Sequence, residues 1–305
     1  MLGILDEGFG TISAFQSLVQ TGRGFGEVSI PHGASVARVA ANALDMSSIA
    51  DLVPQALEIS LSQGELVETF AAALRNADRL DVATASWGVG KPFGDDFSVP
   101  AFAEAKAAID TAVTDGRGGL GTNLVFAAGN ARGSGDNVNH HGFQNSPETI
   151  AVGALDAEGQ PAAFSTPGAS VLVSARGVDV PLETGATGEG TTVSGTSFAA
   201  PQVSATIARM LKANPDLGYR DVQEVLAATA DPTTVDPSQE TQSDESAETG
   251  ELALGTSVNA ASTWNTGGFA FNERVGFGAL DSEAAVRLAK HWDETRTEEN
   301  LAEAT

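Results

Sequence analysis

Residues 194–204 read Ser194-Gly195-Thr196-Ser197-Phe198-Ala199-Ala200-Pro201-Gln202-Val203-Ser204, and a helical apolar pattern follows them. Glycine and small residues allow a tight turn into a helix, which would place Ser197 in the first helical turn. The N–H groups of that turn lack helical partners, and the helix dipole favours negative charge there. Pro201 is tolerated near a helix start. The stretch predicts a serine nucleophile with half of an oxyanion site beside it; a plain glycine-serine cap on a core helix is the alternative.

Outward from this stretch, short apolar runs alternate with amphipathic or alanine-rich segments. The runs predict strands at Leu2–Leu5, Leu57–Leu61, Asp81–Ser86, Asn123–Ala128, Thr149–Ala154 and Val171–Ala175. The segments predict helices at Gly33–Leu44, Glu65–Asn76, Phe102–Thr114, Ser197–Ala213, Arg220–Ala230 and Ser282–Trp292. Strands that alternate with helices imply a mainly parallel sheet with helices on both faces, a three-layer α/β/α sandwich. Sites in such folds lie at the carboxyl ends of the strands.

The composition excludes several classes of function. The 305 residues contain no cysteine, which rules out a disulfide scaffold, a thiolate metal site and a cysteine nucleophile. Forty acidic residues against 16 basic ones give a net charge of −24, which argues against binding to nucleic acid. No apolar run reaches the roughly 18 residues of a membrane helix. Asp6 and Glu7 interrupt the first apolar stretch, so we expect no signal peptide in this chain.

Three further segments carry residues that a serine nucleophile needs. They are Gly3-Ile4-Leu5-Asp6-Glu7-Gly8, His32-Gly33-Ala34-Ser35-Val36-Ala37 and Asn123-Leu124-Val125-Phe126-Ala127-Ala128-Gly129-Asn130. His32 can accept the serine proton, and Asp6 can orient the imidazole. Asn130 can donate its side-chain amide to a tetrahedral oxyanion. Singly, an aspartate after a strand is a turn former and a histidine at a helix start is a cap; together the residues favour catalysis.

These four segments resemble those of the subtilisin-like serine proteases, in the chain order Asp6, His32, Ser197. The resemblance leans toward the kexin/furin branch and its bacterial relatives. It rests on Ser86-Trp87-Gly88, residues 142–146, residues 214–217 with 220–223, and residues 274–278. It implies a subtilisin-like fold and a serine endopeptidase that forms an acyl-enzyme on Ser197. It also implies that substrate runs along Ser86, Trp87 and Gly88 and beside Ala128 and Gly129.

The chain departs from that family in its extent and in one motif. The family's histidine motif has other residues where this chain has Ala34, Ser35 and Arg38, and only five residues precede Asp6. We therefore predict that residues 1–292 are a catalytic domain without its N-terminal part, with further domains in the full-length protein. Residues 231–257 are acidic without a basic residue and predict a mobile surface insert. Residues 293–305 form a second acidic segment, the tail.

The sequence also carries candidate ligands for calcium and candidate residues for substrate specificity. Asp95, Asp96, Asp136 and Asn137 offer the oxygen ligands that Ca²⁺ prefers. The resemblance implies a structural calcium near the specificity pocket with Asp136 as one ligand, although Thr166 stands where another acidic ligand is expected. It also places His141 where the kexin branch has an acidic pocket residue. We therefore predict a weak preference for basic substrate residues.

The expected substrates are proteins or peptides, and the expected location is extracellular or at the cell surface. Two other functions stay open. One is a non-catalytic module of this fold in a larger surface protein. The other is a serine hydrolase that acts on non-peptide esters. His140 and His141 could suggest a metal site, but a polar loop is the preferred interpretation.

Overall fold

The computed structural model describes residues 1–6, 32–44, 52–56, 71–182, 191–231, 257–258 and 270–292. Six parallel strands form the main sheet, in the order β2-β1-β3-β4-β5-β6. They are β1 (Leu2–Asp6), β2 (Leu52–Ala56), β3 (Val82–Ala85), β4 (Asn123–Ala127), β5 (Thr149–Leu155) and β6 (Val171–Arg176). Two antiparallel pairs complete the described strands: β7 (Val180–Leu182) with β8 (Thr191–Val193), and β9 (Ser257–Val258) with β10 (Ala270–Phe271).

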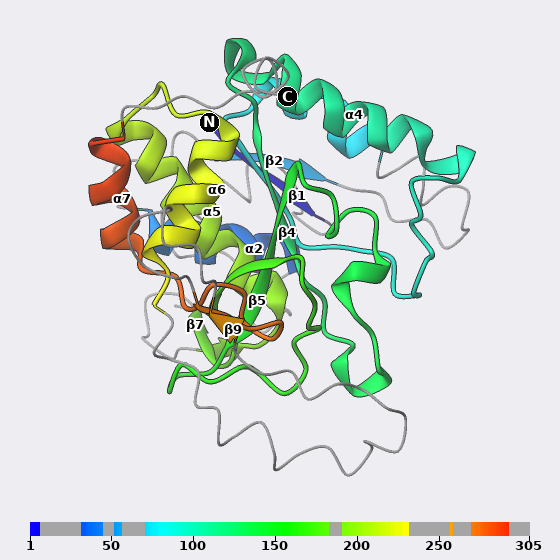
Figure 1. The fold of residues 1–305 in the computed structure, drawn as a ribbon, viewed down its shortest axis with the longest axis vertical. Coiled ribbons are helices and arrows are strands. Elements are labelled where there is room, and N and C mark those ends of the chain that lie inside the picture. Colours follow the sequence, from blue (N-terminus) through cyan, green and yellow to red (C-terminus); the bar gives the residue numbers. More distant parts are fainter. Residues whose placement is uncertain are drawn as a thin grey trace.

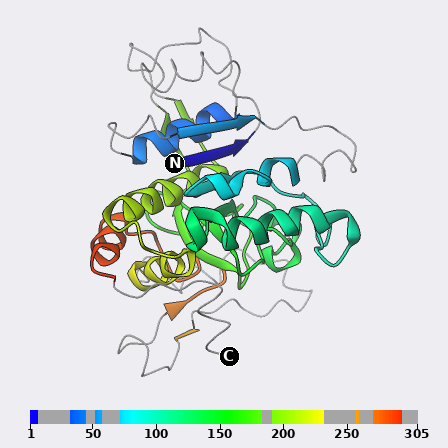
Figure 2. The same ribbon diagram turned by 90° about the horizontal axis from the view of Figure 1, so that it is seen from above.

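Helices cover both faces of the sheet. The described helices are α2 (His32–Ala43), α4 (Ala103–Thr114), α5 (Thr196–Ala213), α6 (Tyr219–Thr229) and α7 (Ser282–Lys290). Figure 1 shows α2, α5, α6 and α7 together on one side of the sheet, with α4 on the other. The turned view in Figure 2 shows β1 and β2 side by side. The predicted three-layer α/β/α sandwich is confirmed.

The core explains why the strands read as continuous apolar runs. In β4, Val125 and Ala127 belong to the core under α5, whereas Leu124 and Phe126 belong to the core under α4. All five residues of this strand are buried. A strand of a parallel sheet is covered on both faces, so it has no polar alternation.

Most predicted elements agree with the structure to within two residues at each end. The predicted strand Leu57–Leu61 lies outside the described residues, and the strand that the structure has in this region is Leu52–Ala56. The predicted helix Glu65–Asn76 is described only from residue 71, where helix runs to residue 74. Among the described residues, no helix has the length and apolar character needed to cross a membrane.

The predicted acidic insert is held at both ends. The backbones of Asp231 and Ala279 exchange two hydrogen bonds, of 2.8 and 3.1 Å, and Ser257 pairs with Phe271 in the β9–β10 ladder. Residues 232–256 and the predicted tail 293–305 lie outside the described part of the chain. The interior of the insert and the tail therefore stay sequence-based predictions.

The strand order places several predicted site residues at one edge of the sheet. β1 has β2 on one side and β3 on the other, so successive strands are added on opposite sides of β1. Such a switch point is where α/β sheets bind ligands. Leu5 pairs with Ala85, so the next residues, Asp6 and Ser86, lie together at the carboxyl edge.

Candidate active site

Ser197 is the second residue of α5 and is buried, with 8% of its surface exposed. The preceding Gly195 has φ 149° and ψ 155°, a backbone conformation that L side chains rarely adopt. This glycine turns the chain abruptly from β8 into the helix. As a result, the Ser197 N–H lies in the first helical turn, where helix geometry supplies no partner for it.

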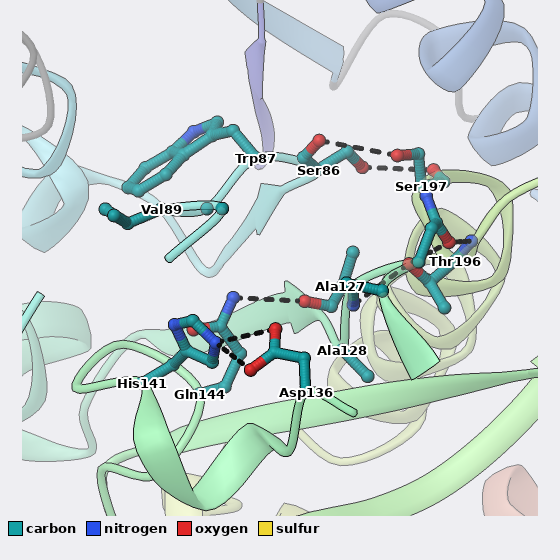
Figure 3. Close-up of a pocket in the computed structure, with 15 residues that line it drawn as sticks. Ser86, Trp87, Val89, Ala127, Ala128, Asp136, His141, Gln144, Thr196 and Ser197 are labelled. Carbon is teal, nitrogen blue, oxygen red and sulfur yellow. Dashed lines mark hydrogen bonds and ion pairs between the residues drawn. The ribbon is translucent and has the colours of Figure 1, made fainter. Parts of the chain in front are cut away.

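Pro201 leaves the backbone carbonyl of Ser197 open to a hydrogen bond from outside the helix. Proline has no N–H, so the carbonyl of Ser197, four residues earlier, lacks its usual helical hydrogen bond. Ser86 Oγ donates to this carbonyl at 3.0 Å, and Ser197 Oγ lies 3.4 Å from the Ser86 carbonyl oxygen (Figure 3). The two contacts fix the serine to the end of β3. Sequence reasoning missed this role of Ser86, and the signal for it was a proline at the fourth position after the nucleophile.

Asn130 follows β4 and is oriented by the residue before Ser197. Its Oδ1 accepts hydrogen bonds from Thr196 N at 2.9 Å and from Thr196 Oγ1 at 3.0 Å. Because these bonds use the oxygen, the amide nitrogen is the atom left to donate. Nδ2 lies 3.5 Å from the position that a Cβ on Gly195 would occupy. An amide donor therefore lies beside the start of α5, as stabilisation of an oxyanion requires.

His32 and Asp6 are the two remaining members of the predicted triad, and the structure describes the position of the first more fully than that of the second. His32 is the first residue of α2 and is half-buried, and its ring centroid lies 5.6 Å from that of Phe198. Asp6 is the last residue of β1, but its side chain lies outside the described part of the structure. The folded chain thus brings the histidine beside the residue that follows Ser197. The hydrogen bonds of the triad stay a prediction.

A pocket of about 200 Å³ opens beside Ser197 and Asn130. The predicted substrate-contacting residues all line it: Ser86, Trp87, Gly88, Ala128 and Gly129. The Trp87 ring also packs edge-on against Phe126 and Phe143, with centroid distances of 5.4 and 5.2 Å. This packing joins the segment after β3 to the aromatic core under α4, so that wall of the pocket is held firmly.

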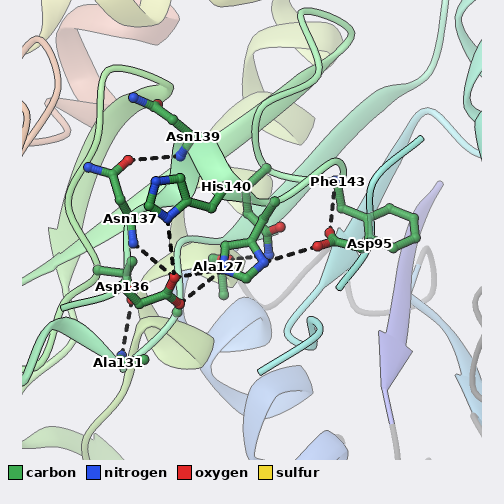
Figure 4. Close-up of polar contacts among 12 residues, drawn as sticks. Asp95, Ala127, Ala131, Asp136, Asn137, Asn139, His140 and Phe143 are labelled. Carbon is green, nitrogen blue, oxygen red and sulfur yellow. Dashed lines mark hydrogen bonds and ion pairs between the residues drawn. The ribbon is translucent and has the colours of Figure 1, made fainter. Parts of the chain in front are cut away.

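His141 corrects the expectation of a polar loop, because it is buried and contacts two acids, Asp95 and Asp136. Both acids are labelled in Figure 4. Its Nδ1 lies 3.0 Å from Asp95 Oδ1, and its Nε2 lies 2.9 Å from Asp136 Oδ2. The hydrogen bond with Asp95 raises the pKa of His141, burial lowers it, and the contact with Asp136 raises it further. Sequence reasoning missed this cluster because Asp95 is 46 positions away in the chain.

The region around Asp136 does not fit a calcium ion. Both Asp136 oxygens lie within 3.0 Å of His141 Nε2, and Oδ1 also accepts from Asn137 N at 2.9 Å. A cation would have to take the place of these N–H donors. Asp96 instead accepts from Ser98 N, and Thr166 Oγ1 accepts from Ala131 N at 3.0 Å. Within the described part of the chain, no group of three acidic or histidine side chains is arranged for a metal.

Comparisons with known proteins agree with this geometry. The family model for the subtilase family (Peptidase_S8) matches residues 28–278. "Endoprotease aex-5" from Caenorhabditis elegans is 32% identical over 218 residues, covering 71% of this chain and 36% of that protein. The "Dibasic-processing endoprotease" from Schizosaccharomyces pombe is 35% identical over 215 residues, covering 69% and 27%. The chain thus spans about a third or less of the length of these relatives.

Solved structures share the fold. The serine protease of Aeromonas sobria superposes with a TM-score of 0.66 at 18% identity, covering 96% of this chain and 60% of that one. The family match covers most of the chain and includes the helix start at Ser197, the pocket and Asn130. On this evidence the chain belongs to the subtilase family.

Proposed function

We propose that this chain is a serine endopeptidase that hydrolyses peptide bonds through an acyl-enzyme on Ser197. The observation that carries the proposal is the convergence at the start of α5. There a buried serine, an oriented asparagine amide and a pocket lined by residues 86–90 meet at one edge of the sheet. Family membership supports the same activity.

In the proposed mechanism, Ser197 Oγ attacks the substrate carbonyl carbon while His32 accepts the hydroxyl proton. Asp6 holds the imidazole and stabilises the imidazolium. The negative charge that develops on the carbonyl oxygen is stabilised by Asn130 Nδ2 and the Ser197 N–H. The C–N bond then breaks as His32 protonates the leaving amine. Water, deprotonated by His32, releases the acid and restores Ser197.

Substrate backbone is proposed to lie as an extended strand along residues 86–89. These residues follow β3 without being part of it, and they line the pocket. An extended peptide can add hydrogen bonds to such a segment. Proteins or peptides are the proposed substrates.

We also propose an extracellular or cell-surface location, with further domains in the full-length protein. A net charge of −24 favours solubility in a salty medium, which supports this location. The short coverage of the relatives supports further domains.

The test is labelling with a fluorophosphonate probe, followed by digestion of a peptide library. Labelling of the chain, its loss in Ser197→Ala and in His32→Ala, and cleavage of peptides would support the endopeptidase. A folded chain that resists the probe would instead be a non-catalytic module. A chain that is labelled and cleaves esters but no peptide would be a hydrolase of another class. Circular dichroism of each variant controls for folding.

A further inference from the structure

The segment 91–102 carries three phenylalanines, and only one of them is exposed. Phe97 and Phe102 pack edge-on against Phe143 in the core under α4, with ring centroids 5.1 and 6.1 Å apart. Phe93 instead keeps 66% of its surface exposed, the largest value among the exposed large apolar side chains that the structure describes. The two packed rings anchor the segment, so Phe93 is held in its exposed position rather than carried on a loose loop.

Phe93 also has a strained backbone. Its φ is 59°, in the left-handed region, which is an outlier for a bulky residue. Gly94 N–H donates to the Lys91 carbonyl at 2.9 Å, so Phe93 is the third residue of a tight turn whose second residue is Pro92. Turns with a positive φ at this position usually take glycine there. Glycine would make the same turn without strain, so the turn itself does not require the phenyl ring. Strain of this kind is concentrated at functional sites.

His140 fixes both the backbone and the ring of Phe93. The Phe93 N–H donates to the His140 carbonyl at 2.9 Å, and the centroids of the two rings lie 4.7 Å apart at an interplanar angle of 37°. We call these two rings the Phe93 ledge. Because the ring is already fixed while most of its surface is uncovered, a partner that packs on it has little ordering left to impose.

The Phe93 ledge is connected to the pocket beside Ser197 from two directions. Along the chain, Gly90 lines the pocket and Phe93 follows three residues later, a separation of at most about 11 Å. In space, His140 Nδ1 lies 4.0 Å from Oδ1 of Asp136, which also lines the pocket (Figure 4). A peptide seated in the pocket can therefore reach the ledge with a neighbouring side chain.

We propose that the Phe93 ledge is a secondary binding site for the peptide substrate, where one aromatic or large aliphatic side chain packs beyond the residue held in the pocket. The inference rests on the proposed peptidase function and adds a second substrate position to it. An apolar substrate side chain gains by leaving water, and an aromatic one gains further from ring-to-ring contact with Phe93. The strained turn serves this site because it presents the phenyl ring to solvent.

The test moves a single phenylalanine along a serine-rich peptide whose cleavage site is kept constant. At each position, kcat/KM is compared with that of the parent peptide, which has serine there. We expect phenylalanine to raise kcat/KM at one position by about three- to tenfold, the scale of one added aromatic contact. In Phe93→Gly, this gain should fall below about twofold, whereas Phe93→Tyr should retain it because the ring stays. The rate of fluorophosphonate labelling should be equal in all three chains, because the probe reacts at Ser197 and places no peptide on the ledge.

Three measurements separate a binding role from a structural one. Phe93→Asn also tolerates the left-handed region, so it removes the ring without the added freedom of glycine, and it should lose the gain as well. Val99→Ser is the matched control, because Val99 is 45% exposed in the same segment with an ordinary φ of −85°, and it should leave the gain unchanged. The urea midpoint of Phe93→Gly should not fall, because glycine relieves the strain.

The outcomes are distinguishable from failure of the proposed function. No fluorophosphonate labelling and no cleavage of any peptide by the unaltered chain would overturn the peptidase itself. Labelling and cleavage without a gain from phenylalanine at any position, or with a gain that persists in Phe93→Gly and Phe93→Asn, would overturn only the ledge. An equal gain from lysine at the same position would overturn the apolar class of side chain. A clear fall in the urea midpoint of both variants would show that folding requires the ring, and would overturn the argument from strain.

Discussion

Replacement of Ser86 by alanine tests how the nucleophile is held. The change removes the hydroxyl that donates to the Ser197 carbonyl at 3.0 Å. Pro201 has no N–H to donate to that carbonyl, so nothing in the helix can take over. Ser86→Ala should therefore leave a buried acceptor without a partner.

The magnitude follows from that unpaired carbonyl. Both Ser86 and Ser197 are 8% exposed, so water cannot easily solvate the freed oxygen. Leaving such a group without a donor costs about 1–3 kcal/mol in free energy of unfolding. Pro201→Ala restores an N–H at the fourth position after Ser197. In that background, Ser86→Ala should cost no more than about 0.5 kcal/mol, because the helix now supplies the donor.

The assay is urea denaturation followed by circular dichroism, with all variants carrying Ser197→Ala to prevent self-digestion. That change leaves the backbone carbonyl of residue 197 in place. The double-mutant cycle of Ser86→Ala and Pro201→Ala should give a coupling energy of about 1–2 kcal/mol. Thr111→Ala is the control: its Oγ1 bonds to Ala107 O in α4 at 2.9 Å, and its effect should not depend on residue 201. An equal cost of Ser86→Ala in both backgrounds would refute the reasoning.

Four further predictions follow from the site and the sequence. Asn130→Ala should lower kcat by roughly 10²–10³-fold with little change in KM, on the scale that the removal of one oxyanion donor has in subtilisin, and an unchanged kcat would exclude this role. The 40 acidic residues of the sequence predict a calcium site away from Asp136, so calcium should increase the free energy of unfolding by about 2.7 kcal/mol at 100 times Kd, with the same gain in Asp136→Asn; equal melting temperatures in calcium and in EDTA would contradict the calcium prediction, and a smaller gain in the variant would make Asp136 a ligand. The pKa of His141 is raised above 6.5 in the folded chain, so its contribution to the free energy of unfolding is complete below pH 6.5 and is lost as the pH rises through the folded pKa. The difference in free energy of unfolding between the unaltered chain and His141→Gln should therefore narrow over that range. A difference that widens would show that folding shifts the pKa in the opposite direction. Replacing residues 232–256 by a short Gly/Ser link should leave the melting temperature nearly unchanged, since loop closure changes by only about 0.6 kcal/mol per doubling of length, and loss of folded protein would show that the segment is structural.

Local patterns in the sequence are enough to predict the helices and strands and the position of the nucleophile. The run Asn123–Ala127 is apolar at nearly every position, which is typical of a strand covered on both faces, and the structure has it at the centre of the sheet. Residues 194–204 predicted a helix that starts at the serine, and α5 begins at Thr196. These signals depend on spacing over a few residues, which the covalent chain itself controls.

The partners of the site residues depended on the tertiary structure. Ser86 and Ser197 are 111 positions apart, and Asp95 and His141 are 46 apart. Their contacts arise because β3 and β4 are neighbours in the sheet and because α5 packs against both strands. The adjacent pair His140 and His141 predicts a polar loop, yet folding buries His141 between the carboxylates of Asp95 and Asp136. Such pairs could not be derived from the sequence, because the charge and hydrogen bonding of a buried group are set by whichever distant segments the strand order brings against it.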